Sequence, residues 1–140
     1  MQIHSYLTFN GNCREAMQFY KRCFGGELTI QTVGSIDPSK DMPREMMDCV
    51  LQASLVQGTA VIMATDMVGE EGLNRGNAVS MLINCSSEME LRRCYDRLSA
   101  GSRIQSQIEE TASGALFGQL TDKYGNSWLL RYQLNAFSDQ

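Results

Sequence analysis

The fold is decided by residues 3–27, IHSYLTFNGNCREAMQFYKRCFGGE, in which the hydrophobic period changes from two residues to about 3.6. Over residues 3–9 apolar and polar side chains alternate, which predicts a strand with one buried face. After Asn10-Gly11 the apolar residues recur three and four positions apart, which predicts a helix with one apolar face. That face consists of Cys13, Ala16, Met17, Tyr20, Cys23 and Phe24. The stretch therefore predicts a strand followed directly by a helix.

Signals for the two ends of this helix return later in the chain. A polar residue followed three positions later by Glu predicts a helix start with a capping box, and glycine predicts the helix end. The equivalent positions are Asn12 and Ser87, Glu15 and Glu90, and Gly26 and Gly101. Because each pair is 75 residues apart, the sequence predicts an internal structural repeat.

The remaining pattern predicts a strand at residues 78–85 before the second helix and three more strands after each helix. These three strands are expected at residues 27–33, 48–56 and 59–65 in the first half, and at residues 103–109, 116–120 and 128–134 in the second. Residues 34–45 hold both prolines and predict a loop. The predicted fold class is α+β, with two tandem βαβββ modules.

The whole chain, residues 1–140, is expected to form one domain built from these modules. Module one spans residues 1–66, the linker residues 67–76, module two residues 77–134 and the tail residues 135–140. A single module has too small a core and exposed sheet edges, and two modules side by side correct both defects.

Composition excludes several classes of protein. The formal net charge is −4, whereas nucleic-acid binding requires a basic face. The five cysteines lack C-x-x-C spacing and predict reduced, mostly buried thiols. No apolar run approaches the roughly 18 residues of a membrane span, and the first residues lack signal-peptide features. The sequence therefore predicts a cytoplasmic protein without nucleic-acid or membrane partners.

Several of these segments resemble a known family. The matching residues are Tyr6-Leu7-Thr8-Phe9-Asn10-Gly11-Asn12, Glu15-Ala16-Met17, Phe19-Tyr20, Phe24-Gly25-Gly26-Glu27 and Leu120-Thr121-Asp122-Lys123-Tyr124-Gly125-Asn126-Ser127-Trp128. They resemble the PhnB-like branch of the glyoxalase/bleomycin resistance protein/dioxygenase (vicinal oxygen chelate) superfamily. The resemblance implies that each module contributes a curved four-stranded sheet and that the modules form a mixed-sheet cleft for a small ligand.

Metal-using members of this superfamily place one ligand on the first strand and one on the fourth strand of each module. The positions of this chain that match these ligands are His4, Met63, Ser80 and Leu129. Divalent ions prefer several oxygen or imidazole donors, and Met and Leu supply neither. We therefore expect no conventional metal site within one chain and no other cofactor. A second chain could complete such a site.

Members of this branch sometimes carry a ubiquinone-methyltransferase name. The sequence has no glycine-rich loop between a strand and a helix that would hold a methyl-donor nucleotide. We therefore do not expect this activity.

Strand parity predicts which side chains face the cleft. They are His4, Tyr6, Thr8, Val61, Met63, Ser80, Leu82, Leu129 and Arg131. This set is mostly apolar with a few polar groups, which is typical of a small-molecule pocket. Arg131 could bind a carboxylate or phosphate there, or could be a solvated charge at the strand end.

Three hypotheses for function follow. The first is a protein that binds a small molecule without a conventional metal site. The second is a metal-dependent or His4-assisted enzyme of the lyase or dioxygenase type, since neutral imidazole can act as a general base. The third is a non-catalytic homodimeric interaction protein, favoured by the sheet edges and by methionines near the loop at residues 34–45. That loop could equally be a lid over the cleft, a subunit contact or merely disordered.

Overall fold

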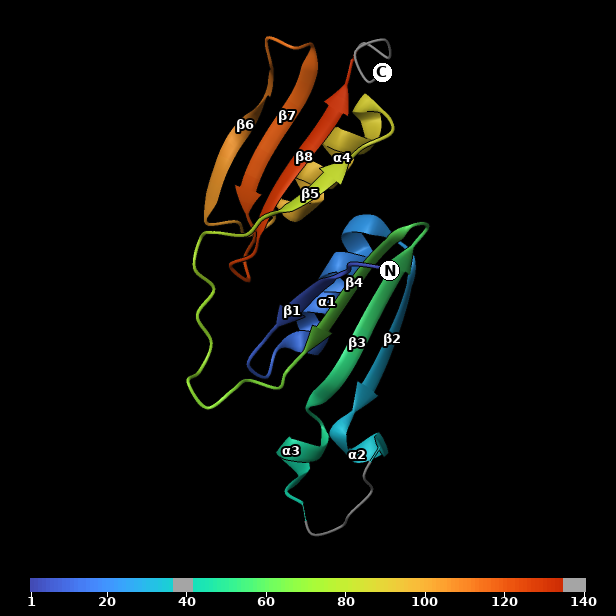
Figure 1. Cartoon of the computed structure of the whole chain (residues 1–140), viewed down its shortest axis with the longest axis vertical. Helices are drawn as coiled ribbons and strands as arrows, with labels where there is room; N and C mark the ends of the chain where they lie inside the picture. The colour runs from blue at the N-terminus through green and yellow to red at the C-terminus, as the bar shows by residue number, and fades with distance from the viewer. Residues whose placement is uncertain (37–41, 135–140) are drawn as a thin grey trace. The chain divides into compact units, whose positions relative to one another are not determined.

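The computed structural model describes residues 1–36 and 42–134 (Figure 1). They form two compact units, Met1–Asn74 and Arg75–Gln140, and each unit has the predicted strand, helix and three further strands. The α+β class and the repeated element order are therefore confirmed. Residues 37–41, in the predicted loop, and residues 135–140, the predicted tail, lie outside the described residues.

The first unit contains one four-stranded mixed sheet and its helix. Its elements are β1 (Ser5–Thr8), α1 (Cys13–Phe24), β2 (Glu27–Thr32), β3 (Val50–Gln57) and β4 (Ala60–Thr65). The strand order is β1-β4-β3-β2. β1 runs parallel to β4, whereas the other neighbours are antiparallel. The βαβ crossover therefore places β1 at the edge beside the last strand of its own unit.

The core of the first unit lies between α1 and one face of this sheet. α1 packs against β2, β3 and β4. Met17 and Tyr20 of the helix are fully buried, and Leu55 and Ile62 are buried neighbours on β3 and β4. Burial of each such side chain contributes roughly 1.5–3 kcal/mol. The other face of the sheet carries the alternate residues of each strand.

The second unit repeats this arrangement. Its elements are β5 (Met81–Asn84), α4 (Glu88–Leu98), β6 (Ile104–Glu110), β7 (Ala115–Thr121) and β8 (Ser127–Gln133). The strand order is β5-β8-β7-β6, with β5 parallel to β8. α4 packs on β7 and β8, and this order matches that of the first unit.

The core of the second unit combines the apolar face of α4 with large side chains of β7 and β8. The buried helix residues are Leu91, Cys94, Tyr95 and Leu98. Trp128 and Leu130 are buried on β8. A Cβ atom at Gly118 would lie 3.0 Å from Cδ2 of Tyr95, so this glycine lets the helix side chain lie against β7.

The start of α4 follows the prediction closely. The Ser87 hydroxyl accepts a hydrogen bond from the backbone N–H of Glu90 at 3.1 Å. The Glu90 carboxylate accepts the backbone N–H of Ser86 at 3.0 Å, one residue before the position that a capping box predicts. Both side chains therefore satisfy N–H groups that the helix itself leaves unbonded.

The start of α1 differs from the prediction. Asn12 makes no side-chain cap hydrogen bond, so the predicted helix cap by Asn12 is wrong. The buried carboxylate of Asp66 takes this role: Oδ1 accepts the backbone N–H groups of Gly11 at 2.9 Å and Cys13 at 3.0 Å. Oδ2 accepts the backbone N–H of Val50 at 2.9 Å. One carboxylate thus joins the end of β4, the start of α1 and the start of β3.

A second buried carboxylate shapes the turn between β7 and β8. Asp122 is fully buried and accepts the backbone N–H groups of Tyr124 at 2.8 Å and Asn126 at 3.1 Å. Its other oxygen accepts the indole N–H of Trp128 at 2.8 Å. This carboxylate therefore fixes both the turn and the largest core side chain of the unit.

The predicted loop at residues 34–45 contains short helices at its ends. α2 (Val33–Ile36) follows β2, where Ser35 and Thr32 exchange side-chain and backbone hydrogen bonds that close a turn. α3 (Arg44–Met47) begins after Pro43, a residue suited to a helix start. The prediction of a loop over all of residues 34–45 is therefore wrong at both ends, because turn-forming residues can also form short helices.

The predicted linker contains no helix or strand in residues 67–76. Its end is held in the second unit, where Nη1 of Arg75 donates to Oδ1 of Asn126 at 2.9 Å. Among the described residues, none of the helices is both long and apolar enough to cross a membrane.

The five thiols divide into two groups. Cys13, Cys23, Cys85 and Cys94 are buried, and Cys49 is half-buried at a bend before β3. Burial raises the pKa of Cys13 from 9.0 to about 12, and the nearby Asp66 adds to this effect. Burial likewise raises the pKa of Cys85 to about 12 and increases that of Cys94. Unfolded thiols ionise first as pH rises, so these groups make the fold less stable above about pH 9.

Replacing Asp66 should destabilise the first unit strongly. In Asp66→Asn the amide NH2 faces a backbone N–H, and the charge-assisted bonds are lost, so we expect a loss of about 3 kcal/mol in the free energy of unfolding. Urea denaturation measures this loss. The exposed Asp48→Asn is the matched control and should change stability by less than about 0.5 kcal/mol. Equal effects of the two substitutions would contradict the role of Asp66.

Two glycines with the same backbone angle separate conformational strain from steric contact. Gly11 and Gly26 both have φ +95°, but a Cβ at Gly26 would lie 2.4 Å from the carbonyl oxygen of Val56, whereas nothing lies within 4 Å at Gly11. Both Ala variants should lose about 1 kcal/mol from strain. Gly26→Ala should lose clearly more in thermal or urea unfolding. A larger loss in Gly11→Ala would contradict the close approach of β3 to this turn.

Thiol labelling should reveal a single reactive cysteine. With a disulfide reagent at pH 8, Cys49 should react first, because the other four thiols are buried and burial raises the pKa values of Cys13, Cys85 and Cys94. Cys49→Ser should remove the fast phase, while Cys23→Ser should keep it, and all five thiols should react in urea. Rapid labelling of Cys13 or Cys85 in the folded protein would contradict this assignment.

Candidate functional site

Seven of the nine predicted site residues lie on the sheet faces that α1 and α4 do not cover. We call these the helix-free faces. In β4, Ile62 and Ala64 are buried towards the helix, so Val61 and Met63 belong to the opposite face. Tyr6 on β1 is the direct neighbour of Met63 in the register of the sheet. Strand alternation therefore places these three side chains on one surface of the first unit.

The first unit brings together four predicted residues. Tyr6, Val61 and Met63 share the surface just described, and Thr8 lies two positions after Tyr6 on the same face. Tyr6 is exposed, whereas Met63 and Val61 are half-buried. Ser54 is the neighbour of Met63 on β3 and extends the row across the sheet.

Two predicted residues lie outside the strand ladders. His4 comes directly before β1 and is exposed, and its Nε2 atom lies 3.2 Å from Oε1 of Gln2. Ser80 comes directly before β5 and is also exposed. Neither side chain is positioned by strand pairing, so the predicted strands at residues 3–9 and 78–85 extend too far at their starts.

The second unit positions the other predicted residues in two adjacent rows. In the first row, Leu82 on β5 is the neighbour of Leu129 on β8, which is next to Gln119 on β7. In the second row, Arg131 on β8 is the neighbour of Asn84 and Phe117. We call the residues Leu82, Asn84, Phe117, Leu129 and Arg131 the second-sheet patch.

The patch contains side chains that the sequence reasoning missed. Asn84 lies two positions after Leu82, so strand parity could have identified it. Phe117 depends on the register of β7 and β8, which the turn around Asp122 sets. Glu109, the neighbour of Phe117 on β6, follows an irregularity in the register after Ser106. No sequence pattern signals this irregularity.

Arg131 is held in place by a chain of hydrogen bonds. Its Nη2 atom donates to Oε1 of Gln133, which follows two positions later on β8. The amide nitrogen of Gln133 donates to the carbonyl oxygens of Ser113 at 3.2 Å and Gly114 at 3.4 Å. Arg131 is half-buried. The turn before β7 anchors Gln133, and Gln133 in turn holds the guanidinium of Arg131. These bonds therefore fix the direction of the guanidinium.

The donor set does not fit a divalent metal. Of the four family positions, Met63 and Leu129 offer no hard donor, and Ser80 offers a neutral hydroxyl. In residues 1–36 and 42–134, no three His, Cys, Asp or Glu side chains gather as metal ligands. Burial raises the pKa values of Cys13, Cys85 and Cys94, which disfavours the nucleophilic thiolate at these positions. The arrangement therefore suits binding by side chains.

Comparison with known proteins assigns the chain to a family. The family model described as 3-demethylubiquinone-9 3-methyltransferase matches residues 1–131. The protein YjdN of Escherichia coli (strain K12) is 26% identical over 138 residues, covering 93% of this chain and 94% of its own length. The match thus includes both units.

Solved structures agree with this assignment. Protein PA1353 from Pseudomonas aeruginosa is 31% identical, with a TM-score of 0.82 over 96% of this chain and 99% of its own. The PhnB protein from Bacillus cereus is 25% identical, with a TM-score of 0.73 over 94% and 99% of the two chains. Glyoxalase/bleomycin resistance proteins at 13% and 15% identity share the fold, with TM-scores of 0.64. The chain therefore belongs to the 3-demethylubiquinone-9 3-methyltransferase family, and it shares the fold of glyoxalase/bleomycin resistance proteins.

Proposed function

We propose that this protein binds a small organic molecule on the helix-free faces of its sheets, through side chains rather than a conventional divalent metal. The observation that carries the proposal is the apolar surface of the second-sheet patch. A sheet face in contact with water normally carries polar residues. Here Leu82 is 52% exposed, and its neighbour Leu129 and the nearby Phe117 are only half-buried. An apolar surface beside polar groups is the usual character of a small-molecule site.

The polar groups on this surface supply specificity. Asn84 and Arg131 are neighbours on β5 and β8, beside the pair of Leu82 and Leu129. A ligand with both apolar and polar parts would therefore contact both pairs at once. Tyr6 and Met63 offer a similar combination on the first unit. The chemistry that this supports is binding, and we assign no reaction to it.

The family name describes a methyl transfer, which these features do not support. Methyl-donor nucleotides are commonly held by a glycine-rich turn between a strand and a helix. The corresponding turns here read Asn10-Gly11-Asn12 before α1 and Ser86-Ser87 before α4. The first turn binds Asp66 with its backbone N–H groups, so these donors are already used by the protein. Ligand binding without methyl transfer is therefore our proposal for the chain.

NMR tests the proposal directly. We expect small aromatic fragments, among them benzamide and benzoate, to shift backbone resonances of β5, β7 and β8. Leu129→Asp should weaken this binding by about 10-fold or more, because it places a charge within the apolar surface. The matched control Leu73→Asp changes an exposed leucine of the linker and should bind like the native protein.

The proposed function would be wrong if no fragment shifted these resonances. It would also be wrong if both Asp variants bound normally while circular dichroism showed both of them folded. Concentration-dependent shifts in the absence of fragments would instead indicate that a second copy of the chain covers the patch.

A further inference from the structure

We infer that the second-sheet patch recognises an amphipathic acid, with its carboxylate or phosphonate group on Arg131 and Asn84 and its apolar body on Leu82 and Leu129. This inference rests on the proposed function and specifies its ligand class. Arginine side chains bind anions in general, and here the neighbouring residues also determine where each part of the ligand lies.

The patch offers two hydrogen-bond donors side by side. Arg131 and Asn84 are direct neighbours on parallel strands, and adjacent strands lie about 4.8 Å apart. Two oxygens of one acid group can therefore reach both side chains. A guanidinium binds such a group with two parallel N–H bonds, and an amide NH2 supplies a further donor.

A hydrogen bond within the protein holds the Arg131 side chain in place. The bond from Arg131 to Gln133 fixes the guanidinium, and Gln133 is itself bound to the carbonyl oxygens of Ser113 and Gly114. Gln133 is a neutral amide, so this bond orients the guanidinium and itself brings no negative charge next to it. An ordered charged donor loses less side-chain entropy on binding than a mobile one. Arg131 is therefore better prepared for an anion than an exposed, mobile arginine.

The apolar row beside these donors sets the direction of the ligand. Leu82 and Leu129 lie two residues before Asn84 and Arg131 on the same strands, so they form an adjacent apolar row. On the other side of Arg131, Phe117 separates it from the acidic Glu109 on β6. Glu109 would repel an acid group placed over Phe117, so the acid group lies on the Asn84 side of Arg131 and the apolar body extends over the adjacent leucines.

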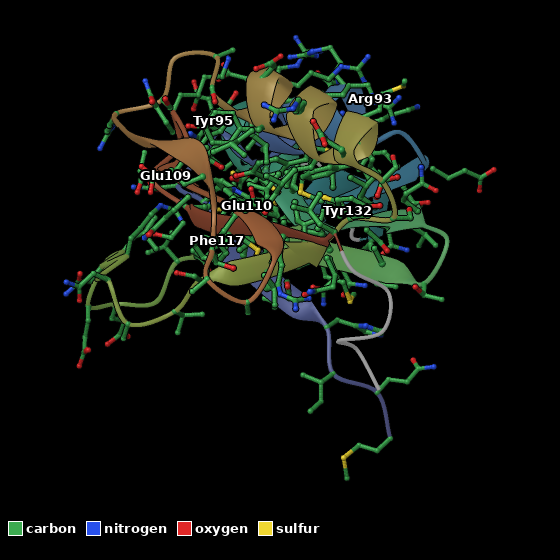
Figure 2. The ribbon with its side chains drawn as sticks, turned by 90° about the horizontal axis from the view of Figure 1, so that it is seen from above. Arg93, Tyr95, Glu109, Glu110, Phe117 and Tyr132 are labelled. Atoms are coloured by element: carbon green, nitrogen blue, oxygen red, sulfur yellow. The ribbon has the colours of Figure 1, made fainter. Side chains whose placement is uncertain are left out.

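Figure 2 helps to separate this surface from the helix side of the unit. Arg93 lies on α4, and Phe117 belongs to the opposite, helix-free face of the sheet, as the strand register also requires. Arg93 is exposed. It therefore provides a matched control: the same loss of charge on the same unit, away from the patch.

The test compares charged and neutral probes of similar shape. Benzoate and phenylphosphonate should bind about 10-fold or more tightly than neutral benzamide, as expected for hydrogen bonds to a charged group. Arg131→Gln should remove this preference, whereas Arg93→Gln should keep it. Preference for one of the two acids identifies its head group as the better match.

The possible failures are distinguishable. If benzamide and benzoate bound the patch equally, the acid-recognition inference would be overturned, while the proposed function would stand. If neither acid nor benzamide shifted patch resonances, both would be overturned. Equal losses in Arg131→Gln and Arg93→Gln would show a general charge effect and would also overturn the inference. Thermal unfolding of each variant shows that the comparison is made between folded proteins.

Discussion

The buried carboxylate of Asp66 is the contact on which the first unit depends. It receives hydrogen bonds from backbone N–H groups that come from two separate parts of the chain, residues 11–13 and Val50. Buried N–H groups without acceptors are costly, so the end of β4 must remain where Asp66 can reach all of them. This requirement fixes where α1 begins relative to the sheet. Asp122 acts similarly in the second unit, where it joins the last turn to the indole of Trp128.

The position of each helix on one face of its sheet determines which side chains lie on the other face. Once Trp128 and Leu130 are buried under α4, Leu129 and Arg131 must point away from it. The patch therefore follows from core packing and strand alternation. Within the patch, Gln133 orients the guanidinium of Arg131 through an amide group that is itself hydrogen-bonded to the backbone. A binding surface can thus form on this fold without metal ligands.

Much of the fold could be predicted because its signals are local. Period-two strands and two helices with matched end signals gave the order of elements, and alternation correctly separated Leu129 from the core. The contact of Asp66 with Cys13 could not be predicted, because the two residues lie 53 positions apart and Asn12 offers a plausible local cap. Glu109 was missed because its position depends on a strand irregularity. His4 and Ser80 were placed in strands by extending the alternation beyond the residues that pair.

The central claim is that side chains of the patch bind the ligand and that a metal does not. Calorimetry of benzoate binding in excess EDTA, compared with binding after addition of Zn²⁺, Ni²⁺ or Mn²⁺, tests this claim most directly. The account predicts the same affinity under all conditions, since Arg131 and Asn84 hold the acid group themselves. Binding that disappears in EDTA and returns with one of these ions would contradict it.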